Sequence, residues 1–270
     1  MKFRAELAVL FILLAPALLR AVDLKPETLQ EWEASVQVAK TRMEHRASGH
    51  APFLWVDEET PRTQRVKAGE ILVEPADGES PHTVEGGLIH DWIGAMFIPK
   101  AKLADAMGVL GDYEHYQDIY KPMVGKSKLL ERTQDHEKVS LVMVQKAYSV
   151  TAAVETENEV DIVRLDADRA YSFSASVRVQ EIMDYGQPTE RALPADHGRG
   201  YVWRMFTLTR VEQRDDGVYV ERDVMGLSRG IPWVFRWLVQ PLAERLPRNI
   251  LQSILNDTRD AVSKKLTPSP

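Results

Sequence analysis

The sequence predicts an α+β fold in which an antiparallel meander of strands precedes a long C-terminal helix. Six segments between residues 124 and 225 have β-type composition, and most of the links between them are short and rich in turn formers. Strands joined by tight turns run antiparallel, because a parallel neighbour needs a crossover of a dozen or more residues. With 270 residues, 44% of them hydrophobic, the chain can bury one large core.

The main domain is expected over residues 86–266, with a first strand that ends at Pro99 and a helix from about Lys100 that Gly111 stops. "TQDHE", "DADR" and "RDDG" read as hairpin links, the last closed by Asp216-Gly217, and only the link 184–199 is long. The further strands are predicted over residues 124–132, 137–146, 149–161, 170–181, 200–213 and 217–225.

A helical pattern follows the last strand, with apolar residues at multiples of a turn between Leu246 and Ala261. Pro241 and Pro247 each remove a hydrogen bond from a helix. We therefore expect a short tryptophan-rich helix and then a longer one from about Pro247, before a tail over residues 267–270.

An extra helix is predicted over residues 25–46, before the main domain. Leu29, Trp32, Val36 and Met43 recur there at steps of three and four residues, which is typical of a docking face. Residues 48–85 are rich in proline, glycine and charge, so residues 22–85 are expected to form this helix and a connector that packs on the main domain.

The first 21 residues have the pattern of a secretory signal peptide. Lys2 and Arg4 precede a short apolar run, and Ala17 and Ala21 both offer a cleavage point. The run is shorter than the roughly 20 residues that span a bilayer. We expect a periplasmic or secreted protein without a membrane span after cleavage.

The composition excludes several kinds of site. Without cysteine, the chain has no disulfides or thiolate chemistry. The net charge of -6 and the lack of a basic run argue against nucleic-acid partners. The seven histidines are scattered without metal-ligand spacing, and Gly86-Gly87 is too short for a phosphate loop. No metal site and no cofactor is therefore expected.

The order strand, helix, six strands and long helix comes with the stretches "GDYEHYQDIYKPMVGKSKLLER" and "YVWRMFTLTRVEQRDDGVYVERDVMGLSRGIP". Together they resemble the START-like or polyketide cyclase-like helix-grip superfamily (SRPBCC), in particular an exported bacterial branch. The resemblance implies a seven-stranded antiparallel sheet wrapped around the C-terminal helix, and an apolar cavity between the two that binds lipids or other hydrophobic molecules. The superfamily includes carriers and cyclases, so the fold does not settle the function.

The stretch Gly226-Leu227-Ser228-Arg229-Gly230 matches the G-x-S-x-G pattern of hydrolase nucleophiles. Every histidine precedes Ser228 and the predicted sheet is antiparallel, so the usual triad order is missing. A triad with an upstream histidine remains a minor alternative. We interpret Gly226 as the end of the strand, and Ser228 or Gly230 as part of a helix cap.

Two groups of polar residues remain as candidates. One is Asp112, His115 and Asp118 with Tyr113, Tyr116 and Tyr120, which we interpret as a structural wedge. The other consists of charges within strands: Arg178, Arg204, Arg210, Glu221 and Asp223. These form either an exposed salt-bridge ladder or an anchor for the polar head of a ligand. The alternation in residues 201–212 leaves open which face points inward, and indicates that both faces are partly covered or that one lines a cavity.

The sequence favours binding of a hydrophobic small molecule or lipid, without a catalytic set. The first alternative is a cofactor-free cyclase or dehydratase that uses Tyr116, His197 or Glu221 as acid or base. The second is an interaction module with a filled cavity and a protein partner on the N-terminal helix. The candidate cavity lining is Tyr148, Phe173, Arg178, Trp203, Arg204, Phe206, Glu221 and Trp233.

Overall fold

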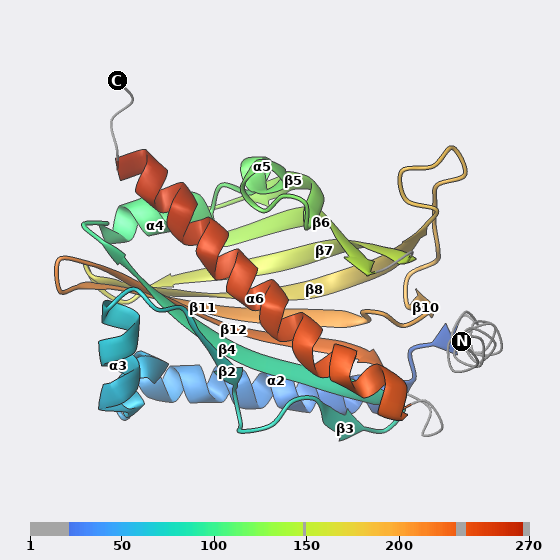
Figure 1. Ribbon diagram of the computed structural model, residues 1–270, viewed down its shortest axis with the longest axis horizontal. Coiled ribbons are helices and arrows are strands. Elements are labelled where there is room, and N and C mark those ends of the chain that lie inside the picture. Colours follow the sequence, from blue (N-terminus) through green and yellow to red (C-terminus); the bar gives the residue numbers. More distant parts are fainter. Residues whose placement is uncertain (1–21, 148–149, 231–235, 267–270) are drawn as a thin grey trace, which may run out of the picture.

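The computed structural model describes residues 22–147, 150–230 and 236–266, so the predicted signal peptide and tail lie outside the described residues. A large sheet is crossed diagonally by a long C-terminal helix (Figure 1). The helical elements are α2 (Pro26–Ala47), η1 (Trp55–Glu58), α3 (Thr60–Lys67), α4 (Leu103–Leu110), η2 (Tyr113–His115), α5 (Tyr116–Ile119) and α6 (Arg236–Leu266).

The main sheet is antiparallel and has the order β2-β4-β12-β11-β8-β7-β6-β5. Its seven long strands confirm the seven predicted ones: β4 (Gly87–Pro99), β5 (Val124–Arg132), β6 (His136–Ala147), β7 (Val150–Arg164), β8 (Arg169–Met183), β11 (Arg204–Arg214) and β12 (Gly217–Arg229). Short strands extend it: β2 (Leu72–Pro75) and β3 (His82–Val84) beside β4, and β9 (Arg191–Ala192) beside β8. In the long link, β10 (His197–Gly198) pairs with β1 (Val22–Asp23).

The helix α6 covers one face of the sheet, which we call the inner face. Leu251, Leu255 and Val262 are buried in a cluster with α4 and the strands β4 and β12. The prediction of two helical pieces is wrong, because α6 runs through Pro241 and Pro247 as one helix. Each proline costs one backbone hydrogen bond, and the burial of this apolar stripe offsets that loss. No helix in the described ranges is long and apolar enough to cross a membrane.

The opposite face of the sheet, which we call the outer face, is covered by the N-terminal segment. Trp32, Ala39 and Met43 of α2 lie in one buried cluster with η1, α3 and the outward side chains of β4, β11 and β12. The predicted docking face of this helix therefore packs on the chain's own sheet. Coverage of both faces explains why strand 201–212 carries apolar residues on each side.

The hairpin between β11 and β12 turns one residue earlier than predicted. Asp215 and Asp216 both have left-handed backbone angles, with φ of 57° and 62°, as a two-residue type I′ turn requires. Gly217 already belongs to β12, and a Cβ there would lie 2.5 Å from the carbonyl oxygen of Ile98. Gly217 is therefore needed for the close packing of β12 against β4 and not for the turn.

Candidate functional site

The register of the strands assigns each side chain to a face. Directly opposed residues share a face, so Gly94, Arg222, Thr209 and Ser172 form one row across four strands. A Cβ added at Gly94 would lie 2.6 Å from Cδ1 of Leu255 in α6, which places the row on the inner face. The odd-numbered residues of β4 and β12 therefore point to the outer face.

A strip of the inner face stays accessible to solvent although α6 crosses the sheet. Among the described residues, a Cβ added at Gly226 would meet no atom within 4 Å, whereas Gly94 is in tight contact with α6. The helix contacts β4 and β2 near one edge of the sheet. Towards its C-terminal end it contacts α4 and α5. The described part of α6 therefore covers the central strands less than it covers β4 and β2. This inner strip consists of the partly exposed residues Ser172, Ser174, Met205, Thr207, Arg222, Val224, Gly226 and Ser228.

Polar groups on the inner face have unused hydrogen-bonding capacity. Nε of Arg222 and Oε2 of Glu137 are buried and have no hydrogen-bond partner in the described part of the chain. The other oxygen of Glu137 accepts a bond of 2.5 Å from Arg132. Burial raises the pKa of Tyr113 well above its ordinary value, and the nearby Arg222 opposes that rise. The inner face thus offers a cation and several hydroxyl groups to a molecule above the strip.

The tyrosines of η2 and α5 hold this part of the chain against α6, as the structural interpretation predicted. Tyr116 donates to the carbonyl oxygen of Leu110. The hydroxyl groups of Tyr120 and Thr258 lie 3.0 Å apart, which links α5 to α6. Both tyrosine rings are buried, and burial raises the pKa of Tyr116 far above its ordinary value. His115 lies in an exposed pair with Asp112.

Ser228 has a histidine neighbour but not the setting of a nucleophile. Its Oγ lies 3.0 Å from Nε2 of His90, on the adjacent strand. Nδ1 of His90 is buried and has no partner in the described residues, so no acid orients the ring. The prediction that Gly226 ends the strand is wrong, because β12 continues to Arg229 and Ser228 pairs with Leu88 in the ladder. The expected helix cap falls on residues outside those described.

Most of the predicted cavity-lining residues do not lie between the sheet and α6. Phe173, Trp203 and Phe206 pack in or against the outer-face cluster, and Lys40 of α2 lies 5.5 Å from the ring of Phe173. Arg178 forms a half-exposed pair with Glu157 at 2.9 Å. Arg204 is paired with Asp196. The side chains of Tyr148 and Trp233 lie outside the described residues. The predicted lining was wrong because both faces of the sheet carry apolar side chains, so apolar character did not show which face points towards α6.

The remaining candidate, Glu221, also lies on the outer face, in a fully buried ion pair. Oε2 of Glu221 accepts a bond of 2.8 Å from Nε of Arg210. Its two oxygens also accept the backbone N–H groups of Trp55 and Val56, each at 2.9 Å. Glu221 therefore fastens the connector to the sheet and has no free oxygen for a substrate.

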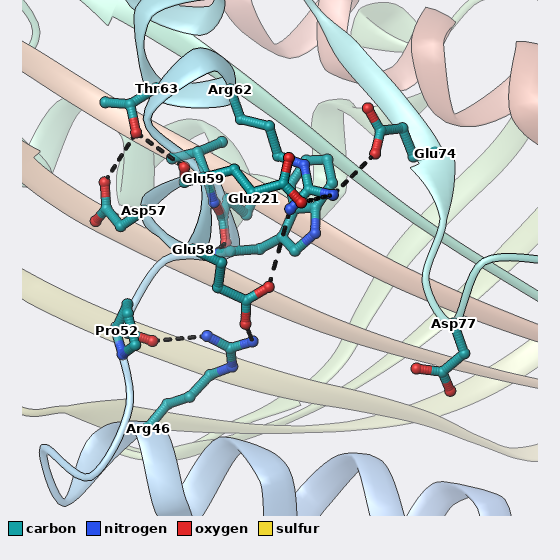
Figure 2. A network of polar contacts seen from close by, with 12 residues as sticks. Arg46, Pro52, Asp57, Glu58, Glu59, Arg62, Thr63, Glu74, Asp77 and Glu221 are labelled. Atoms are coloured by element: carbon teal, nitrogen blue, oxygen red, sulfur yellow. Dashed lines mark hydrogen bonds and ion pairs between the residues drawn. The ribbon is translucent and has the colours of Figure 1, made fainter.

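Next to this ion pair lies a cavity of about 220 Å³ between α2, η1 and the outer face. Figure 2 shows Arg46 reaching from α2 towards Glu58 and the carbonyl oxygen of Pro52. Arg62 of α3 lies among acidic side chains of the same connector, including Glu74 at 3.3 Å (Figure 2). Sequence reasoning missed this cavity, because residues 48–85 carry no motif that indicates a site.

Two buried carboxyl groups lie side by side on the outer face, and one of them, Asp223, lines this cavity. Asp91 and Asp223, on neighbouring strands of the outer face, are 8% and 5% exposed. Burial, followed by the charge of Asp223, raises the pKa of Asp91 to about 8, and burial also raises the pKa of Asp223. Near neutral pH Asp91 is therefore protonated. The described residues contain no cluster of three or more histidine, aspartate or glutamate side chains that could hold a metal ion.

Known proteins resemble this chain in structure and not in sequence. No family model matches the chain, and no curated protein matches it. It is similar to the solved structure of a STAR-related lipid transfer protein (fragment 25–204) from Xanthomonas axonopodis, at 18% identity over 67% of this chain and 96% of that chain, with a TM-score of 0.45. The protein TTHA0849 from Thermus thermophilus shows 16% identity over 65% and 98%, with a TM-score of 0.45. The Zhui aromatase/cyclase from Streptomyces shows 14% identity over 66% and 96%, with a TM-score of 0.42. Lipid-transfer and aromatase/cyclase proteins are thus among the structural neighbours of this chain.

Proposed function

We propose that this protein binds a hydrophobic small molecule or lipid between the inner strip and α6. The observation that carries the proposal is the contrast within one face of the sheet. Leu255 of α6 packs against Gly94, whereas no atom of the described residues lies within 4 Å of a Cβ built at Gly226, and the residues around Gly226 are partly exposed. Central strands crossed by a helix bury their side chains unless a space is kept between them.

The chemistry of the strip fits a ligand with an apolar body and one polar group. Val224 and Met205 supply apolar surface, and Ser174 and Thr207 supply hydroxyl groups. Arg222 supplies a cation with an unused Nε–H group. Ligand sites are typically apolar with a few polar groups that fix orientation. We therefore expect Arg222 to hold an anionic or strongly polar head.

The test is to fill the space and look for the ligand. Native mass spectrometry and solvent extraction of the purified protein should show a co-purifying apolar molecule. Gly226→Trp should reduce its occupancy at least tenfold, since the ring would occupy the open space. Gly108→Trp is the matched control, because a Cβ at Gly108 also meets no atom of the described residues within 4 Å, but Gly108 lies exposed on α4. A ligand-free protein, or a Gly226→Trp variant with unchanged occupancy, would contradict the proposal.

The enzyme alternative has no group available among the three named for it. Tyr116 is buried and donates to Leu110. His197 lies at the surface, 2.6 Å from a carboxylate oxygen of Asp23, and Glu221 is consumed in its buried ion pair. The interaction module loses the apolar face of α2, because Trp32 and Met43 pack on the sheet.

Export remains a proposal that rests on the N-terminal sequence. Lys2, Arg4 and the apolar run that follows them support it. Cell fractionation with N-terminal sequencing of the mature chain tests it. A start at residue 18 or 22 is expected, and an intact Met1 in the cytoplasmic fraction would contradict it.

A further inference from the structure

The outer-face cavity contains guanidinium groups that are only partly used. Arg46 donates to Pro52 and is paired with Glu58, but its Nε–H has no partner in the described residues. Arg210 donates from Nε to Glu221, but its Nη2 has no partner there either. The two side chains are 6% and 2% exposed, come from α2 and β11, and line the same cavity. Buried N–H groups are rarely left unpaired, so the guanidinium groups of Arg46 and Arg210 both retain donor capacity beside the cavity.

The same cavity is also lined by a buried carboxyl group, Asp223. Its hydrogen-bonding neighbour among the described residues is the protonated Asp91, so its two oxygens retain capacity to accept further hydrogen bonds. The charged side chains around Asp223 and Asp91 come from several elements. They are Arg42 and Arg46 of α2, Arg210 of β11, Glu58 of η1 and Asp77 of the link after β2. Donors and acceptor therefore come from separate elements that meet only in the folded chain.

The neighbouring ion pair of Arg210 and Glu221 shows that polar groups on this face are not left unpaired in general. Glu221 has both oxygens satisfied, by Arg210 and by two backbone N–H groups. A connector that served only to cover the sheet would be more stable with apolar side chains in place of the unpaired groups. Asp223 and Arg46 thus carry a cost that a bound molecule would remove.

We propose that this cavity binds a small molecule that carries a carboxylate together with an amino or hydroxyl group, of the size of a single amino acid or hydroxy acid. The guanidinium groups of Arg46 and Arg210 pair with the carboxylate, and Asp223 accepts from the amino or hydroxyl group. The volume of about 220 Å³ corresponds to roughly seven water molecules at about 30 Å³ each, which suits such a molecule. The half-exposed pair of Arg42 and Asp77, 3.2 Å apart, lies where the cavity meets solvent.

The experiment is thermal unfolding of the purified chain with defined probes. L-Alanine, L-serine and L-lactate carry both groups, whereas propionate and ethylamine carry one each. At a hundredfold excess over Kd, the two-group probes should raise Tm by roughly 5 °C or more, and isothermal titration should give one site per chain. No response to any two-group probe would show a cavity that holds only water and would overturn the proposal. An equal response to propionate would overturn the role of Asp223.

Three variants test whether the two-group probes bind in this cavity. Asp223→Asn keeps the size of the side chain but removes its charge, and should weaken L-alanine binding at least tenfold. Ala76→Leu fills the cavity without changing any charged group, so it tests the site even if Asp223→Asn does not fold. Asp166→Asn alters an exposed carboxylate in the turn after β7 and should keep the full response. Persistent binding in Ala76→Leu would overturn the proposal.

This site is independent of the proposed function, because it lies on the other face of the sheet. Gly226→Trp should leave the response to L-alanine unchanged, and Ala76→Leu should leave the apolar ligand of the inner strip in place. Loss of both ligands in either variant would contradict the assignment of two separate sites.

Discussion

The two faces of this sheet are covered in different ways. The outer face is covered by α2 and its connector through a dense cluster that includes fully buried polar anchors such as Glu221. The inner face is covered by α6 mainly near β4 and β2, while residues around Gly226 remain partly exposed. Close packing and buried ion pairs stabilise the first arrangement around one cavity of about 220 Å³, whereas the second leaves part of the sheet partly exposed. This difference supports the proposal that part of the inner face binds a ligand.

The largest effect is expected where the outer face buries its ion pair. Arg210→Ala should destabilise the fold by about 3–5 kcal/mol, because it leaves the Glu221 charge buried without its partner. Arg178→Ala is the control, since its exposed pair with Glu157 should contribute at most about 1 kcal/mol. Urea unfolding at neutral pH measures both. Equal losses would show that the outer anchor carries no special weight.

The next effect concerns the docking of α2. Met43→Ala should cost about 2–5 kcal/mol, because Met43 is fully buried against the sheet. Val38, on the same helix, is 58% exposed, so Val38→Ala should change the free energy of unfolding by less than about 0.5 kcal/mol. If Met43→Ala unfolded as the wild type does, α2 would not be part of the outer core.

A pair of glycine changes compares the tight and open parts of the inner face. Gly94→Ala should destabilise by about 1–3 kcal/mol, because its Cβ would lie 2.6 Å from Leu255. Gly226→Ala should be neutral or slightly stabilising, since no atom of the described residues lies within 4 Å of the new Cβ and the new residue restricts the unfolded chain. Denaturant midpoints measure the difference, and a large loss at Gly226 would close the proposed space.

The smallest effect is a pH dependence that differs between the faces. The pKa of Asp91 on the outer face is raised to about 8, so the folded state holds a proton there that the unfolded state releases above about pH 4. Its contribution to stability is therefore full in acid and falls as pH rises towards 8. Asp91→Asn should remove this slope and raise stability at pH 8 by at least about 1 kcal/mol.

His90 on the inner face should act in the opposite sense. Burial lowers its pKa to about 4, so the unfolded state binds a proton between pH 6.5 and 4 that the folded state does not. Stability from this group is lost as pH falls through that range, and His90→Gln should remove the loss. Unfolding curves between pH 4 and 9 for both variants separate the two slopes. Identical profiles in wild type and variants would contradict these assignments.

Much of the fold could be predicted from the sequence for local reasons. β5 begins at Val124 and ends at Arg132 as expected, because turn formers bound each strand and the links are too short for crossovers. The helix before the connector was also found, since the spacing of Trp32 and Met43 follows the helical period. The short strands β3 and β9 were missed, because segments of two or three residues carry too little periodicity.

The candidate sites depended on information that is not local. Phe206 and Glu221 were assigned to the ligand cavity, yet both lie under the N-terminal segment. The pairing of Asp91 with Asp223 and the convergence of Arg46 with Arg210 bring together residues that are far apart in the sequence. No spacing rule connects such positions.

The sequence by itself determined the element order, the antiparallel meander and the apolar stripe of the N-terminal helix, because hydrophobic period and turn chemistry act over a few residues. Only the tertiary structure decided which face of the sheet each residue joins. Alternation divides a strand into two sets, but when both faces are covered, both sets contain apolar residues. The choice was made by packing, with Leu255 against Gly94 on one side and Trp55 and Val56 bound to Glu221 on the other.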